Sequence, residues 1–147
     1  MQEILFRGKR IDTGEWIEGY VYRVFEKFRT TFLMVKDMHA CSYEVDPETV
    51  GQYIGLKDKN GKRIFEGDIV KAVSRDYYGS EFQGVVLFKG GCFGVEFEYL
   101  PKISSRKSFH RIGEIGRWQD MGASGTISYT YEVIGNIHDN PELLREG

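Results

Sequence analysis

The stretch that decides the fold is QYIGLKDKNGKRIFEGDIV, residues 52–70. Asn60 and Gly61 at its centre have the composition of a two-residue β-hairpin turn, because both residues tolerate a positive φ. The segments on either side are rich in β-branched and large apolar residues, which favour strands. A second turn at Gly67 leads into another apolar run that starts at Ile69. The stretch therefore predicts two hairpin-linked strands followed by a bend into a third.

The rest of the chain also predicts strands rather than helices. Aromatic residues make up 14% of the chain, and 18 glycines with only 3 prolines provide many sites for sharp turns. Further strands are predicted at residues 4–11, 16–24, 30–36, 41–45, 84–88, 93–99 and 129–138. Asp46 and Asn140, each followed by proline, predict two brief helical turns. The apolar residues of 102–125 follow neither the spacing of a helix nor the alternation of a strand. We therefore expect a long loop there with a short helix around residues 105–111.

Composition and charge narrow the class of protein. The 147 residues suffice for one ordinary domain, and a formal net charge of −2 gives no overall attraction to nucleic acid or anionic membranes. There is no apolar run long enough to span a bilayer and no signal-peptide pattern at the N-terminus. Cys41 and Cys92 lack metal-binding or redox spacing, so we expect reduced packing residues, with a single bridge as the alternative. These features predict a cytoplasmic protein.

Two long motifs and one shorter pattern support a family resemblance. Residues 53–70 closely resemble the central signature of the YopX family of phage and prophage proteins. The sequence YEVIGNIHDNPELL at residues 131–144 is similar to the C-terminal signature of the same family. LFRGK at residues 5–9, together with TGEW at residues 13–16, fits its opening more loosely.

The resemblance implies a fold and an origin but no activity. It implies a single YopX-like unit over residues 1–147, with sub-parts 1–50 and 51–147 and a loop insertion at 101–125. The implied fold is mainly β, a small SH3-like barrel with additional strands, one or two short helical turns and the irregular insertion. The implied source is a bacteriophage, or a prophage in a bacterial host. No catalytic residue can be assigned from the family.

The residues themselves give little support to catalysis or to a cofactor. His39 lies two residues from Cys41, but the remaining histidines are scattered and form no metal-ligand spacing. Glu96 and Glu98 share one face of a predicted strand, where a solvated sheet face is the commoner arrangement. The lysines of the hairpin lack the spacing of a phosphate-binding loop. We therefore predict no catalytic residue, no metal, no cofactor and no enzyme.

Binding to a protein is the function that the sequence favours. Tyr77, Tyr78, Phe82 and Trp118 lie in or beside predicted loops, where tyrosine and tryptophan often anchor interfaces. We expect a phage accessory protein that acts as a non-enzymatic binding module in the host cytoplasm. Its partner would be an unknown protein or a second copy of itself.

Nucleic-acid binding is the alternative. Arg106, Lys107 and Arg111 combine cations with the rings of Phe109 and Trp118, a mixture that can hold phosphates and stack on bases. The slightly acidic net charge and the absence of an RNA-binding motif count against it. A membrane partner is not expected.

Overall fold

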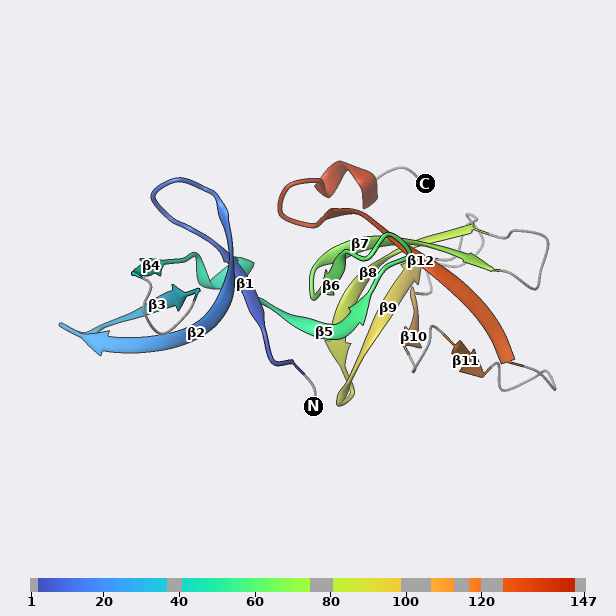
Figure 1. Cartoon of the computed structure of the whole chain (residues 1–147), viewed down its shortest axis with the longest axis horizontal. Coiled ribbons are helices and arrows are strands. Elements are labelled where there is room, and N and C mark those ends of the chain that lie inside the picture. Colours follow the sequence, from blue (N-terminus) through green and yellow to red (C-terminus); the bar gives the residue numbers. More distant parts are fainter. Residues whose placement is uncertain are drawn as a thin grey trace. The chain divides into compact units, whose positions relative to one another are not determined.

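A computed structural model describes residues 3–36, 41–74, 81–98, 107–112, 117–119 and 126–144 of the chain (Figure 1). The chain divides into two compact units, Met1–Gly55 and Leu56–Gly147. Its strands form two antiparallel sheets, and the described helices are two short 3-10 turns, η1 (Pro47–Thr49) and η3 (Pro141–Leu144). The prediction of a mainly β chain with brief helical turns is confirmed. Among the described residues, no helix is long and apolar enough to cross a membrane.

The first sheet has the strand order β4-β3-β2-β1-β5-β6, in which β5 carries the chain from the first unit into the second. Its strands are β1 (Phe6–Lys9), β2 (Trp16–Glu26), β3 (Arg29–Val35), β4 (Ser42–Glu44), β5 (Gly51–Lys57) and β6 (Arg63–Phe65). The core of the first unit is the buried cluster of Ile17, Met34 and Val45, against which Val21 and Phe32 pack. This core lies at the base of the β2–β3 hairpin.

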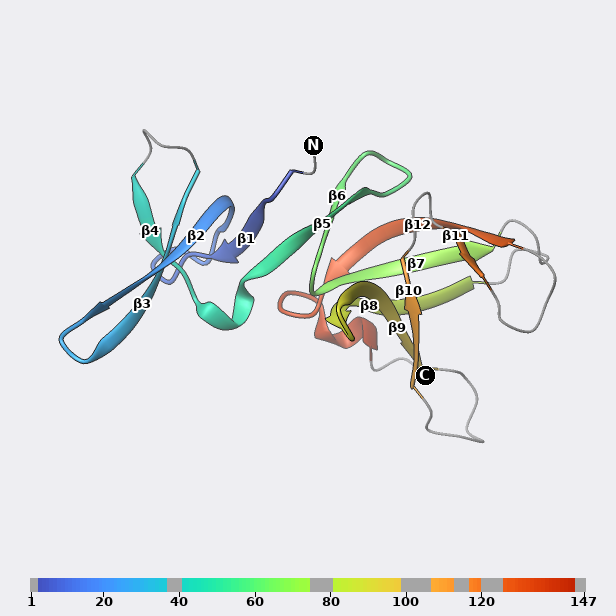
Figure 2. The same ribbon diagram turned by 90° about the horizontal axis from the view of Figure 1, so that it is seen from below.

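The hairpin of β2 and β3 extends beyond that core. β1 pairs with β2 only from Trp16 to Gly19, whereas β3 pairs with β2 from Tyr20 to Glu26. β4 in turn pairs with only the last three residues of β3. The two strands therefore run together as a ribbon, and both views show its tip well past β4 (Figures 1 and 2). We call residues 20–35 of this hairpin the arm. At its tip, residues 24–31 pair only between β2 and β3.

The second unit contains the second sheet, with the order β10-β9-β8-β7-β12-β11. Its strands are β7 (Asp68–Ser74), β8 (Glu81–Lys89), β9 (Cys92–Glu98), β10 (Lys107–Arg111), β11 (Arg117–Gln119) and β12 (Thr126–Asn136). Alternate apolar positions of the central strands are buried, among them Val70, Ala72, Val86, Val95 and Phe97. In β9, Val95 and Phe97 are buried on one face of the strand, and Glu96 lies on the other.

Three expectations need correction. In the part of the chain that the structure describes, neither sheet closes on itself, so the SH3-like barrel is not confirmed: β10 and β11 are the two edges of the second sheet. The predicted helix around residues 105–111 is wrong over Lys107–Arg111, which is a strand because β9 offers it an open edge (Phe109 opposite Glu96). Cys41 and Cys92 are free thiols, and Cys41 is exposed rather than packed.

Candidate functional site

The signature hairpin is held by the carboxylate of Asp58. One carboxylate oxygen accepts hydrogen bonds from the backbone N–H groups of Asn60 and Lys62, each at 2.9 Å. The other accepts one from the N–H of Val133 in β12, at 3.0 Å. Lys59 adds a backbone bond to the carbonyl of Tyr131 (3.0 Å). The two family signatures therefore meet at Asp58, which is 8% exposed.

The same contacts set the acid sensitivity of Asp58. Burial raises the pKa of its carboxyl group, but hydrogen bonds from the N–H groups of Val133, Lys62 and Asn60 lower it, and the pKa lies below its ordinary value of 3.8. A carboxyl group with a lowered folded-state pKa stabilises the fold fully above its unfolded pKa. That contribution is lost as the pH falls from about 3.8 through the lower folded value.

We therefore expect the difference in free energy of unfolding between the native chain and an Asp58→Asn variant to be largest above about pH 5 and to shrink toward about pH 3. Asp12 also has a lowered pKa, but it is present in both chains and cancels from the difference. Urea denaturation at a series of pH values measures this directly. A difference that stays constant over this range would contradict the role of the ionised carboxylate.

The second contact between the signatures lies at Gly67. Gly67 has φ +85, donates its N–H to the carbonyl of Val86 (2.8 Å) and accepts at its own carbonyl from the N–H of Ile137 (2.9 Å). Beside it, the side-chain oxygen of Asn136 accepts from the N–H groups of the two residues after Ile137, at 3.0 and 2.9 Å. These hydrogen bonds join the corner to the start of the C-terminal turn and to β8. The signatures thus form a structural junction.

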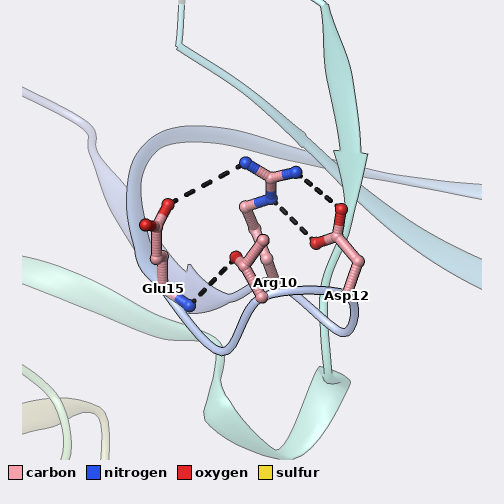
Figure 3. Close-up of polar contacts among 4 residues, drawn as sticks. Arg10, Asp12 and Glu15 are labelled. Carbon is pink, nitrogen blue, oxygen red and sulfur yellow. Dashed lines mark hydrogen bonds and ion pairs between the residues drawn. The ribbon is translucent and has the colours of Figure 1, made fainter.

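The opening motif forms a charged turn between β1 and β2. The guanidinium group of Arg10 donates to both carboxylate oxygens of Asp12, at 2.9 and 2.6 Å, and its other amine lies 4.0 Å from Glu15 (Figure 3). The hydrogen bond from Arg10 lowers the pKa of Asp12. Arg10 also lies over the ring of Tyr43, 4.0 Å from its centroid. With its charge compensated on two sides, Arg10 fits a role in fixing the turn.

The tip of the arm differs from the turn at Arg10, because its apolar side chains are directed to solvent. The register ends at Glu26 opposite Arg29, which leaves a two-residue loop of Lys27 (φ 52) and Phe28 (φ 61). Positive φ costs a residue with a Cβ roughly 1–2 kcal/mol. Phe28 is 98% exposed and Phe25 is 70% exposed. Phe28 in the strained turn and Phe25 in the adjoining strand are both presented to water, which makes this tip the candidate functional site.

The binding residues predicted from the sequence lie elsewhere. Tyr77, Tyr78 and Arg106 are outside the described residues. Lys107 and Arg111 are the first and last residues of β10, and Trp118 is the middle residue of β11. Because β10 and β11 are opposite edges of the second sheet, Trp118 is not on the strand that carries the two cations. The role of these six residues in binding stays a prediction.

Sequence reasoning missed the arm for an identifiable reason. Its loop has neither asparagine nor glycine, the residues that signal a two-residue hairpin turn. The available signal was the spacing: the strands predicted at residues 16–24 and 30–36 lie close enough in sequence for a hairpin, with phenylalanine at positions 25 and 28. For metal sites, no group of three or more candidate ligands occurs among the residues described, and His39 lies outside them.

Comparison with known proteins agrees with the motifs. The family model described as "YopX protein" matches residues 5–145. The chain therefore belongs to the YopX family. Among solved structures it is similar to protein EF1440 from Enterococcus faecalis, with 26% sequence identity over 98% of this chain and 99% of that chain and a TM-score of 0.48. No curated protein matches the chain.

Proposed function

We propose that this YopX-family chain is a phage or prophage accessory protein that acts in the cytoplasm of the bacterial host by binding a protein, without catalysing a reaction. The contact is made by the tip of the arm. Membership of the family supports the origin, and the exposed phenylalanines support the mode of action. The signatures serve the fold, and the arm presents the exposed side chains that a partner can bind.

The observation that carries the proposal is the exposure of Phe28 in a strained loop and of Phe25 near the end of β2. Burial of one such side chain in an interface is worth about 1.5–3 kcal/mol. Aromatic side chains in a pocket, surrounded by a polar rim, are the usual anchors of protein interfaces. Arg23, Lys27 and Glu26 provide such a rim, since all three are exposed around the two rings. The partner surface that matches offers contact to the two rings and charged residues beside them.

The expected result is that a Phe25→Ser, Phe28→Ser double variant loses its partner. The tagged chain is expressed in bacteria that carry the phage or prophage, purified by affinity, and the retained proteins are compared by quantitative mass spectrometry. Loss of two anchors predicts at least about a hundredfold weaker binding. The matched control is Ile11→Ser with Leu144→Ser, which removes two other exposed apolar side chains and should retain the partner.

The proposal is wrong if both variants retain the same proteins in the same amounts. Nuclease treatment of the retained material distinguishes the alternative. If the captured proteins leave with nucleic acid, and if glutamate at Arg106, Lys107 and Arg111 prevents capture, the chain is a nucleic-acid-binding protein. Protein contact through the arm predicts that neither treatment changes the result.

A further inference from the structure

The arm has a free strand edge as well as exposed rings. β1 covers the edge of β2 only as far as Gly19, where it pairs through Phe6. Beyond that point, residues 20–26 of β2 have no strand on this side among the residues described. Unpaired strand edges readily pair with another strand, and proteins protect them with proline, lysine or bulges. This edge has none of the three, and its charged residues are only Arg23 and Glu26.

The backbone groups on this edge can be identified from the hairpin register. In a hairpin with a two-residue loop, the pair that flanks the loop exchanges hydrogen bonds, and alternate pairs do so from there. That pair is Glu26 with Arg29, so residues 26, 24, 22 and 20 direct their backbone groups to β3. Phe25, Arg23 and Val21 direct theirs to the free edge. Continued along the strand, the alternation reaches Gly19, which faces β1 as its pairing requires.

We propose that two copies of this chain associate through the free edges of β2, antiparallel and around a two-fold axis at Val24. The inference rests on the proposed function, in which the arm makes the contact, and it names a second copy as the partner. A two-fold axis lets one edge serve both copies equally. A net charge of only −2 keeps the repulsion between copies small.

The register follows by elimination. Outward-directed residues must face each other, and the registers that form more than one such pair among residues 21, 23 and 25 are centred on residue 22, 23 or 24. A centre at Arg23 places two like charges directly opposite each other, which is destabilising. A centre at Tyr22 brings the second copy's Phe25 beside Gly19, the place that β1 already occupies. Only the centre at Val24 avoids both conflicts.

The side chains of that register are complementary. Arg23 of each copy lies opposite Phe25 of the other, a cation–aromatic pair, and Tyr22 lies opposite Glu26, while its phenol keeps the 2.6 Å hydrogen bond to Ser42 of its own chain. Val24 packs on its own equivalent. Tyr20 and Tyr22 alternate with the outward-directed residues and are 54% and 41% exposed, so the four-stranded ribbon formed by two arms shows an aromatic face. The free edges of two copies can therefore pair in this register without placing like charges opposite each other.

Two variants test the pairing. Arg23→Pro removes an outward-directed N–H and leaves the bonds to β3 intact, so it should weaken self-association at least about a hundredfold in sedimentation velocity. Arg23→Ala keeps the N–H and should associate within about tenfold of the native chain. Circular dichroism and urea denaturation establish that each variant is folded.

Engineered cysteines provide a second measurement that does not depend on tolerance of proline. In a Cys41→Ser, Cys92→Ser background, Val24→Cys places two thiols in a non-hydrogen-bonded pair with Cα atoms about 4.5 Å apart, close enough for a disulfide. Oxidised glutathione should give a covalent dimer with Val24→Cys much faster than with Tyr22→Cys, which lies opposite Glu26.

The outcomes separate this inference from the proposed function. A native chain that is monomeric at all concentrations overturns the inference. The inference is also overturned if the dimer persists in the Arg23→Pro variant, or if the Val24→Cys and Tyr22→Cys variants form the disulfide at the same rate. Arm-dependent capture of another protein by a monomeric chain would leave the proposed function standing with a different partner. Association that follows the Val24 register supports the inference.

Discussion

Replacement of Asp58 by alanine is expected to lower the free energy of unfolding by about 4 kcal/mol, a large part of the stability of an ordinary domain. The substitution leaves the N–H groups of Asn60, Lys62 and Val133 without their acceptor. Because the carboxylate is buried, water cannot fully replace it. The loss therefore includes both the hydrogen bonds and the attachment of the hairpin to β12.

Urea denaturation followed by circular dichroism measures the effect, and Lys59→Ala is the matched control. Lys59 is in the same hairpin, and its ammonium group pairs with Glu132 at 3.3 Å on the surface. Exposed ion pairs contribute at most about 1 kcal/mol, so the control should remain close to the native chain. A loss below about 1 kcal/mol for Asp58→Ala would show that the hairpin does not depend on this carboxylate.

The second large effect is expected at Gly84, where alanine should cost about 3 kcal/mol. A Cβ at this position would lie 2.6 Å from the carbonyl oxygen of Glu96, 2.7 Å from Cγ1 of Val95 and 2.9 Å from Cδ1 of Phe97. Gly84 is in β8, paired with β9 on one side and β7 on the other. The strands must therefore separate or the buried side chains must leave their rotamers.

The control for Gly84 separates steric conflict from backbone strain. Gly90, in the turn between the same two strands, has φ +62 but open space around its Cβ position. Gly90→Ala should cost only about 1 kcal/mol, the strain of a left-handed residue. Thermal denaturation of the two variants under the same conditions measures the loss of stability in each. Equal losses would mean that the close approach at Gly84 is relieved without cost.

Local turn chemistry explains why much of the fold could be predicted. The hairpin turn at Gly61 and the bend at Gly67 each require a positive φ that glycine supplies, and both turns were predicted from their residues. The hairpin loop has three residues, Lys59 to Gly61, rather than the predicted two, and Asn60 has no positive φ. Alternating apolar residues predicted most strands, because a repeat of two residues can be recognised within a short segment. The caps at Asp46 and Asn140 predicted the two 3-10 turns. All of these signals are short-range.

What could not be predicted depends on distant segments. The bond between Asp58 and Val133 joins residues 75 apart, and Asp58 by itself resembles an ordinary turn aspartate. Residues 107–111 became a strand because β9 was there to pair with them, against their polar local composition. Closure of a barrel would need pairing between β10 and β11, which no local pattern encodes. The candidate site was not predicted because Lys27 and Phe28 have a positive φ, a backbone conformation that residues with a Cβ rarely adopt.

The position of β12 in the second sheet has a consequence for synthesis on the ribosome. β12 lies between β7 and β11 and supplies the N–H that Asp58 requires, yet it is translated after every other strand of that sheet. The first unit, whose strands are close in sequence, can complete its core while the rest is still being made. The second unit must wait, with one edge of β7 uncovered, until β12 emerges. Slow translation of residues 75–125 would lengthen that wait and favour aggregation of the nascent chain.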